Sequence, residues 1–347
     1  MTIGAIRFLC FSTANYMKLF YLNLSTTDPA FNLAAEQYVF DSLSRDRMYF
    51  MLWQNENAII IGKYQNTFAE INESYVKEHE IRVIRRLSGG GAVYHDLGNL
   101  NFTFIADAGD LSTLNFRIFC EPVIRTLAKF GIIAEVSGRN DMTIDGRKFS
   151  GNSQYLKQGR VMHHGTILFD SDLSVVANAL QVDESKFQSK ASKSVRSRVT
   201  NVAEHFPVPV SLQEFRSTLL ADIAQSTGSE AYTFSDSDLA AIEKLRVERY
   251  DTWAWNYGFS PACTIERRAR IEGCGTVDIH INVSGGLISE MHFYGDFFSI
   301  QEPDLLAARF VGLIPDEQGY VKALEGVDVS QYFVGLSHDA LLQLLCS

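Results

Sequence analysis

Short alternations of apolar and polar residues divide the first part of the chain into strands. They have the two-residue period of a strand with one buried face, and they predict strands over 18–24, 49–53, 58–61, 81–84 and 101–105. Asp28 followed by Pro29 is typical of a helix start, because aspartate caps the first amides and proline fits the first helical position. An apolar stripe at helical spacing continues this helix to Leu43.

The middle of the chain combines one helix with a run of strands. The helix is expected over 114–130, with Gly131 as its C-terminal cap. Strands follow at 132–136, 142–144, 147–155 and 161–169, and Asp145-Gly146 and Gln158-Gly159 have the composition of hairpin turns. Antiparallel strands with helices on one side predict an α+β fold and not a doubly wound sheet.

The last third predicts helices and then a separate small module. Ser211-x-x-Glu214 is a capping box that opens a helix ending near Gly228, and a second helix is expected from about 238 to 255. The pattern breaks after Tyr257, so we predict a large domain over 1–257 and a small α+β domain over 258–347, with 1–16 as a possible non-structural extension. The small domain should hold strands at 277–283 and 288–293 and helices at 305–313 and 340–346.

Composition and charge limit the possible partners. A formal net charge of −10 argues against a general nucleic-acid or membrane-surface binder, so an anionic ligand needs a local basic cluster. The five cysteines are widely spaced without a C-x-x-C pair, which favours a reducing cytoplasm and argues against a disulfide framework or a zinc site. No apolar run approaches the roughly 20 residues needed to cross a bilayer, and no signal peptide is evident at the start.

The segment that separates two predicted strands, 85–101, carries the strongest chemical signal. Three consecutive glycines, Gly89–Gly91, let the backbone turn sharply and approach a ligand, and such a turn can present amide N–H groups to an anion. Arg85 and Arg86 stand just before it. No Gly-Lys-Ser/Thr follows, and no helix follows, so neither a P-loop nor a dinucleotide-binding turn is predicted. A plain hairpin turn with two solvated arginines stays open as the alternative.

Three further segments carry candidate residues. Asp141 could bind Mg²⁺ or a ribose hydroxyl, or be a turn residue at a strand edge. Strand alternation places Lys148 and Ser150 on one face and Phe149 on the other, so Lys148 is free to enter a polar pocket or to extend to solvent. His163 and His164 point to opposite faces and cannot form one metal site. Residues 186–198 hold five positive charges and no acid, which suits a surface loop or a loop that closes over a polyphosphate.

The order of these motifs resembles the lipoate–protein ligase A family over nearly the whole chain. The motifs are Arg-Arg-x-Ser-Gly-Gly-Gly-Ala-Val-Tyr-His-Asp-x-Gly-Asn, Gly-Arg-Asn-Asp, Gly-Arg-Lys-x-Ser-Gly, His-His-Gly-Thr and the basic segment 194–201. The resemblance implies a large catalytic domain related to biotin protein ligases and class II aminoacyl-tRNA synthetases, with a small accessory domain. It also implies an enzyme that activates lipoate with ATP and Mg²⁺ to lipoyl-AMP. The lipoyl group then passes to a lysine of acyl-carrier domains, such as 2-oxoacid dehydrogenase E2 subunits and the glycine-cleavage H protein.

The resemblance also implies roles for particular residues. Lys148 is the expected catalytic cation, which lies between the lipoate carboxylate and the α-phosphate and offsets their repulsion. The residues expected to bind ATP are Arg86, Gly91, Ala92, Val93, Tyr94, Asn99, Lys148, Arg196 and Arg198. The residues expected to bind lipoate are Lys148, Ser88, Gly89, Gly90, His95 and His164, and Asp141 is the expected Mg²⁺ ligand.

Other activities fit the sequence less well. An acyltransferase of the same superfamily would move lipoyl or octanoyl groups from preformed lipoyl-AMP or an acyl carrier, without ATP. The subtype that forms a cysteine thioester is disfavoured, because no cysteine lies between Cys120 and Cys263, where the pocket is expected. A non-catalytic lipoate sensor ranks lower, since Lys148 and the arginines of the basic loop are both present. A biotin ligase also ranks lower, because the basic loop and the Arg-x-Ser-Gly-Gly-Gly pattern resemble the lipoate branch more closely.

Overall fold

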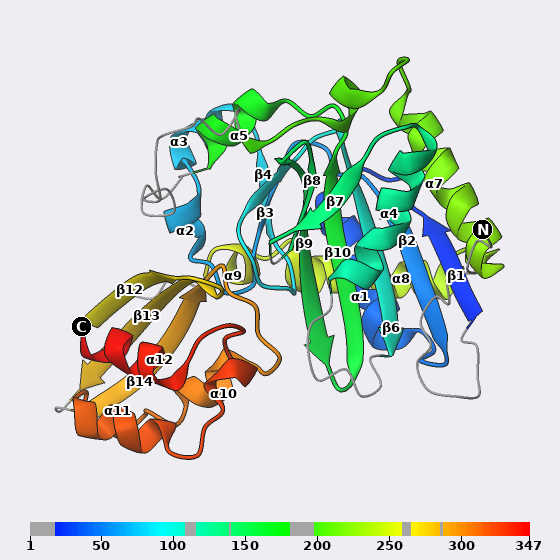
Figure 1. Cartoon of the computed structure of the whole chain (residues 1–347). Coiled ribbons are helices and arrows are strands. Elements are labelled where there is room, and N and C mark those ends of the chain that lie inside the picture. The colour runs from blue at the N-terminus through cyan, green and yellow to red at the C-terminus, as the bar shows by residue number, and fades with distance from the viewer. Residues whose placement is uncertain (1–17, 108–115, 139, 181–197, 259–264, 285–286) are drawn as a thin grey trace, which may run out of the picture.

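An eight-stranded mixed sheet organises the large part of the protein (Figure 1). The computed structural model describes residues 18–107, 116–138, 140–180, 198–258, 265–284 and 287–347. The strand order is β11-β1-β2-β6-β10-β9-β8-β7. The strands are β1 (Lys18–Asn23), β2 (Arg47–Trp53), β6 (Asn99–Asp107), β7 (Ala134–Ser137), β8 (Asp141–Ile144), β9 (Arg147–Lys157), β10 (Arg160–Leu168) and β11 (Glu230–Ala231).

Helices cover both faces of this sheet. Helices α4 (Arg117–Lys129) and α7 (Leu212–Thr227) pack on one face over Phe50, Phe102 and Phe149. Helices α1 (Pro29–Ser42) and α8 (Asp236–Leu245) cover the other face. Strands β1 and β2 are parallel and are joined by α1, whereas β2, β6, β10, β9, β8 and β7 pair in antiparallel fashion. The α+β prediction is confirmed, but the expectation that the helices lie on one side of the sheet is wrong, since they cover both faces.

A second, three-stranded sheet lies apart from the first. Its order is β4-β3-β5, with β3 (Ala58–Ile61), β4 (Arg82–Arg85) and β5 (Val93–His95). The predicted strands 49–53 and 58–61 therefore belong to different sheets and do not form a hairpin. Short helices α2 (Thr67–Glu70), α3 (Glu73–Glu78) and α5 (Leu173–Ala179) accompany this sheet.

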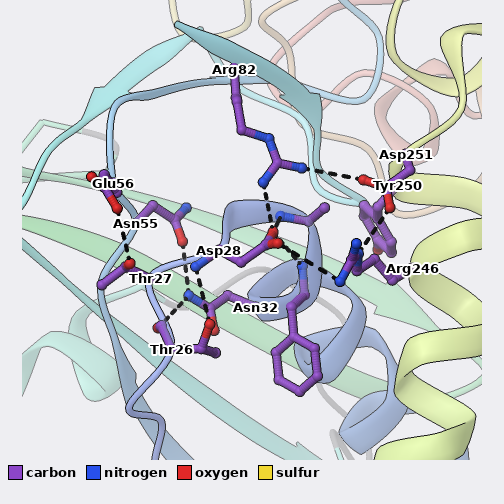
Figure 2. Close-up of polar contacts among 12 residues, drawn as sticks. Thr26, Thr27, Asp28, Asn32, Asn55, Glu56, Arg82, Arg246, Tyr250 and Asp251 are labelled. Carbon is purple, nitrogen blue, oxygen red and sulfur yellow. Dashed lines mark hydrogen bonds and ion pairs between the residues drawn. The ribbon is translucent and has the colours of Figure 1, made fainter. Parts of the chain in front are cut away.

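The helix predicted over 238–255 is interrupted. Helix α8 passes into a π-helix, Arg246–Tyr250, and the chain resumes as α9 (Trp253–Asn256). Polar contacts explain the break: Arg246 pairs with Asp251 at 2.9 Å, and Arg82 links both Asp251 and the α1 cap Asp28 (Figure 2). These contacts stabilise the wider turn of the π-helix, so a regular α-helix does not continue through 246–250.

The small part of the protein has its own core. Strands β12 (Ile265–Ile271), β13 (Gly275–Ser284) and β14 (Leu287–Gly295) form an antiparallel sheet. Helices α10 (Pro303–Ala307), α11 (Glu317–Leu324) and α12 (His338–Cys346) pack around it, together with a short 3₁₀ turn at Val329–Gln331. Another 3₁₀ turn, Val202–His205, belongs to the large part. The predicted helix 305–313 is shorter than expected, and β12 and α11 were not predicted. The predicted boundary falls next to 259–264, outside the described residues.

The two parts touch at the loop after β3. Tyr64 stacks on Phe297 with ring centroids 4.9 Å apart, and its hydroxyl lies 2.7 Å from Ser299 Oγ. Lys63 forms an ion pair with Glu302. The small part therefore abuts the loop that precedes the glycine segment, as Figure 1 shows for the orange and red elements below β3.

Candidate active site

A cavity lies between the two sheets of the large part, on the face covered by α1. It holds about 640 Å³ of empty space when its open mouth is counted. The large sheet and α1 contribute Leu33, Trp53, Asn101, Lys148, Gly151, Asn152, Ser153, His164, Gly165 and Thr166, and Asn140 lies just before β8. The small sheet and its loops contribute Ile60, Arg86, Gly90, Gly91, Ala92, Val93 and His95.

A row of neighbouring residues crosses the large sheet and forms the floor of the cavity. Trp53 pairs with Asn101, and Asn101 pairs with Thr166. The Thr166 hydroxyl accepts a hydrogen bond from the Gly151 amide at 3.2 Å. Because strands lie about 4.8 Å apart, the row from Gly151 to Asn101 is about 10 Å long, and Trp53 lies one strand further on.

Lys148 occupies the end of the floor opposite Trp53. A β-bulge in β9 leaves Phe149 without a partner on β8, since Met142 pairs with Ser150 and Thr143 pairs with Lys148. The bulge puts Lys148 and Gly151 on one face, and the lysine side chain lies across the glycine. Its Nζ pairs with Asp141 Oδ1 at 2.7 Å.

The bulge also corrects one sequence prediction. Ser150 does not share the face of Lys148, because it pairs with Met142, a core residue on the α4 side of the sheet. The prediction that Lys148 and Phe149 face opposite sides agrees with the structure: Lys148 lines the cavity, and Phe149 is completely buried in the core.

The buried side chain of Arg86 holds the glycine segment, Gly89–Gly91, by hydrogen bonds to its carbonyl oxygens. The guanidinium donates from Nη2 to Gly89 O at 2.7 Å and to Gly91 O at 2.9 Å, and from Nη1 to Ile60 O at 3.0 Å. Burial lowers the pKa of Arg86 to about 10, which leaves it charged at neutral pH. Neither arginine is a solvated surface residue, so the plain-hairpin alternative is wrong in that respect.

Arg85 has a different task. Its guanidinium donates to Gly62 O at 2.9 Å, to Gln65 O at 2.6 Å and to the hydroxyl of Thr67 at 2.6 Å. Arg85 therefore fixes the loop after β3, which carries the contact with the small part of the protein.

The small part also packs on the glycine segment. Gly90 donates its amide to Phe297 O at 3.3 Å, and a Cβ at Gly89 would collide with the same carbonyl. Gly89 thus faces the small part of the protein, and it is Gly90 and Gly91 that line the cavity. Absence of a side chain is needed here for close packing as well as for any ligand.

A chain of buried hydrogen bonds runs beneath the cavity. Arg86 Nε donates to Ser88 Oγ at 3.1 Å, and Ser88 lies 2.5 Å from His164 Nε2. His164 Nδ1 lies 2.9 Å from a carboxylate oxygen of Glu36, which also accepts from Thr103. Glu36 is only 2% exposed and ends this chain of contacts in the low-dielectric interior, where His164 and Thr103 are its hydrogen-bond partners.

The three histidines of this region have distinct surroundings. His163 packs against Phe116 and Phe119 in the core, on the face opposite His164, as the alternation predicts. His95 and His164 line the cavity. Burial lowers the pKa of His95 to about 3, with smaller contributions from the charges of Arg86 and His164, so His95 is neutral at physiological pH.

Several predicted site residues lie beside the cavity instead of on its wall. The Tyr94 side chain points away and donates to Asn57 Oδ1 at 3.1 Å, because β5 alternates Val93, Tyr94 and His95. Asn99 is buried and donates to Asn101 Oδ1 at 3.0 Å. Ser88 is absent from the cavity lining and contacts two residues that belong to it, Arg86 and His164. Arg198 is exposed, and Arg196 lies outside the described residues.

Some cavity residues were missed by the sequence analysis. They are Leu33, Trp53, Ile60, Asn101, Asn140, Gly151, Asn152, Ser153, Gly165 and Thr166, together with Glu36 beneath them. Most lie on strands that pair far apart in sequence. The strand register was needed to find them. Asn140, Gly151, Gly165 and Thr166 stood inside motifs that had already been noted, but nothing in those motifs marked them as cavity residues.

Other chemistries have little support in the described residues. There, no group of three or more His, Cys, Asp or Glu side chains is placed to hold a metal ion. Cys120 lies on the buried face of α4, where burial raises the pKa of its thiol to about 12, and it does not line the cavity. None of the helices described is long and apolar enough to span a membrane.

Comparison with protein families identifies the kind of enzyme. Residues 28–224 match the lipoyl protein ligase A/B catalytic domain, and residues 260–345 match the bacterial lipoate protein ligase C-terminus. The cavity and both sheets around it are thus those of a lipoyl protein ligase catalytic domain.

Relatives extend over nearly the whole chain. Lipoate-protein ligase LplJ of Bacillus subtilis is 43% identical, with 94% of this chain and 99% of the relative covered. Lipoate–protein ligase 1 of Staphylococcus aureus is 41% identical with the same coverage. The chain belongs to the lipoate–protein ligase family, and it is a ligase enzyme.

Solved structures agree with the fold. The crystal structure of Plasmodium falciparum LipL1 in complex with lipoate superposes with a TM-score of 0.77 at 23% identity, covering 94% of this chain and 97% of the other. Lipoate-protein ligase A bound with ATP gives a TM-score of 0.62 at 25% identity, covering 71% of this chain and all of the other.

Proposed function

We propose that this protein joins lipoate to carrier proteins in two steps at the cavity. In the first, a lipoate carboxylate oxygen attacks the α-phosphorus of ATP, the bond to the β-phosphate breaks, and pyrophosphate leaves. In the second, the amine of a carrier lysine attacks the carbonyl carbon of lipoyl-AMP and AMP leaves. The observation that carries the proposal is the position of Lys148 at one end of a floor about 10 Å long.

Lys148 is suited to the first step because it can exchange one anion for others. Asp141 holds its ammonium at the cavity without burying it, and both side chains are more than a third exposed. When the lipoate carboxylate and the α-phosphate arrive, the ammonium donates to both, offsets their repulsion and stabilises the charge that grows on the phosphoryl oxygens.

The residues near Lys148 also fit a magnesium ion carried by ATP. Mg²⁺ usually binds one or two carboxylates together with phosphates and water, and Asp141 is a half-exposed carboxylate beside Lys148. Asp141 would hold the ion, which would draw off negative charge from the phosphates. The remaining positive charge comes from the protein itself.

The glycine segment fits the nucleotide end of the cavity. Gly90, Gly91, Ala92 and Val93 line it, and Arg86 adds a buried positive charge directly behind it. We assign Arg86 the role of holding the segment and attracting the phosphates electrostatically, since its hydrogen bonds are directed to protein oxygens. Because the Tyr94 side chain points away from the cavity, we propose that Tyr94 contacts the nucleotide only through its main chain.

The acyl chain of lipoate extends along the floor. Leu33, Ile60, Val93 and the Trp53 ring give this part an apolar lining, which favours burial of the methylenes and the dithiolane ring. The floor length matches an extended eight-carbon acid whose carboxylate lies at Lys148. His164 lines the cavity, and Ser88 supports it through the contact of its hydroxyl with His164 Nε2.

The second substrate is a protein. An archaeal lipoate protein ligase related to this chain at 29% identity is known together with its E2 lipoyl domain. We propose that this enzyme likewise modifies lipoyl domains of 2-oxoacid dehydrogenase E2 subunits and the glycine-cleavage H protein. The carrier lysine must enter the cavity beside Lys148, where the carbonyl of lipoyl-AMP lies.

One experiment tests the whole proposal. The protein is mixed with ATP, Mg²⁺, lipoate and an apo H protein, and pyrophosphate release and the mass of the H protein are both followed. We expect pyrophosphate to depend on lipoate and the carrier to gain one lipoyl group. If ATP and lipoate release no pyrophosphate, but synthetic lipoyl-AMP still lipoylates the carrier, the protein is a transferase.

A further inference from the structure

We propose that His95 is a specificity residue, whose Nε2–H donates a hydrogen bond to a sulfur of the dithiolane ring. This inference rests on the proposed function, because it takes lipoate as the occupant of the cavity. It adds a polar contact at the end of the cavity next to Trp53, on the side away from Lys148. It would make the enzyme prefer a sulfur-containing acid over a hydrocarbon of the same shape.

The protonation of His95 follows from its neighbours. Asn32 Nδ2 donates to two main-chain carbonyls, Thr26 O at 3.1 Å and Gln54 O at 2.8 Å, so the orientation of its amide is fixed. The same nitrogen lies 3.0 Å from Asn55 Oδ1, as Figure 2 shows, so its two hydrogens are shared among three acceptors and the atom of Asn55 that faces it is the oxygen. Asn55 must then present its NH₂ group to His95 Nδ1, which lies 3.1 Å away. His95 Nδ1 is therefore the acceptor, and Nε2 carries the proton of the neutral ring.

Within the part of the chain that the structure describes, that proton has no acceptor. His95 is only 3% exposed, and its Nε2 is a buried nitrogen without a hydrogen-bond partner among the described residues. His95 lines the cavity, so its ring borders the space that an occupant fills. A buried donor without an acceptor is costly, and a ligand that supplies one gains the difference.

His95 lies at the correct end of the floor for the ring of lipoate. Its ring centroid is 6.1 Å from that of Trp53, and Trp53 is the residue of the floor row furthest from Lys148. With the carboxylate at Lys148 and the chain extended, the dithiolane ring reaches the region of Asn101 and Trp53. A ring sulfur is a weak acceptor, whereas a methylene in its place accepts nothing.

The test compares lipoate with 5-cyclopentylpentanoate, in which two methylenes replace the sulfurs of the ring. The two acids have the same ring size and chain, so their ratio of kcat/KM in lipoate-dependent pyrophosphate release isolates the sulfur contact. We expect a preference for lipoate of about tenfold in the unmodified enzyme, because the analogue leaves the donor unpaired.

Two substitutions at the same position separate the donor from the rest of the ring. His95→Asn keeps an acceptor for Asn55 but has no donor at the position of Nε2, and we expect it to lower the preference for lipoate at least threefold. His95→Gln places an amide nitrogen near the position of Nε2, and we expect it to retain most of the preference. Thermal unfolding of both variants checks that they are folded.

The outcomes distinguish this inference from the proposed function. Equal losses with both acids in His95→Asn, leaving the ratio unchanged, would show a purely structural role and overturn the inference. An unmodified enzyme that uses both acids equally would also overturn it, with the ligase activity intact. Absence of pyrophosphate release with either acid would instead refute the proposed function on which it rests.

Discussion

Replacing Lys148 with alanine separates its chemical role from its structural one. The side chain is 40% exposed, and its ion pair with Asp141 is at the surface of the cavity. An exposed ion pair contributes about 0–1 kcal/mol to stability, so the melting temperature should fall by no more than about 2–4 °C. The variant should fold normally and keep its cavity.

The effect on adenylation should be far larger. Two unit charges about 4 Å apart attract by about 4 kcal/mol at the effective dielectric constant of about 20 that suits a half-exposed site. The ammonium would make such a contact with the phosphoryl oxygens as their charge grows. Loss of about 4 kcal/mol from the transition state corresponds to a rate reduced by about 10³-fold.

Lys157 provides the matched control on the same strand. It is 47% exposed and pairs with Asp41 at 3.6 Å, but it does not line the cavity. Pyrophosphate release is measured at saturating ATP and lipoate for Lys148→Ala and Lys157→Ala, with urea unfolding of both. If Lys148→Ala keeps more than a tenth of the activity of Lys157→Ala, the assignment of Lys148 is wrong.

Three further predictions concern the surroundings of the site. Gly151→Ala should reduce the rate of adenylation about tenfold with little change in stability, because the new Cβ would lie 3.2 Å from Lys148 Nζ and displace it; an unchanged rate in a pyrophosphate assay would contradict this. Arg85→Met should lower the free energy of unfolding by about 3–5 kcal/mol in urea titrations, since buried carbonyls lose their donors. Stability should also fall as the pH drops from 6.5 towards 3, because burial lowers the pKa of His95 to about 3 and that of His163 well below 6.5, so that the unfolded chain binds protons that the folded chain does not. His95 contributes about 1.4 kcal/mol per pH unit in that window, and His163 adds to the fall in the same direction; an unfolding midpoint that is the same at pH 7 and pH 5.5 would refute this.

The elements of the fold were largely predictable from local patterns. Proline at the start of α1 and the glycines after α4 and α7 gave helix ends close to those observed. What local patterns do not contain is the partner of each strand. Strands 49–53 and 58–61 are neighbours in sequence, yet they enter different sheets, and the space between those sheets is the cavity.

The arginines show a second limit of the sequence. Charged residues are rarely buried unless they are paired, and a pair of arginines beside glycines looks like an exposed anion site. Arg85 and Arg86 are instead buried, because main-chain carbonyls of the surrounding loops satisfy their guanidinium groups. Such carbonyls come from residues of any type, so the sequence does not mark them.

The bulge at Phe149 connects the sequence of β9 to its chemistry. In a regular strand, residues three apart point to opposite faces, and Lys148 could not lie across Gly151. One extra residue restores the same face to both, and it also lets Phe149 fill the core while Lys148 enters the cavity. The amide of Thr200 then donates to the Lys148 carbonyl at 2.9 Å, so the chain returning from the basic segment is fixed to the strand at the lysine itself. The position of the proposed catalytic cation thus depends on main-chain geometry that is set on both sides of it, in addition to its exposed ion pair with Asp141.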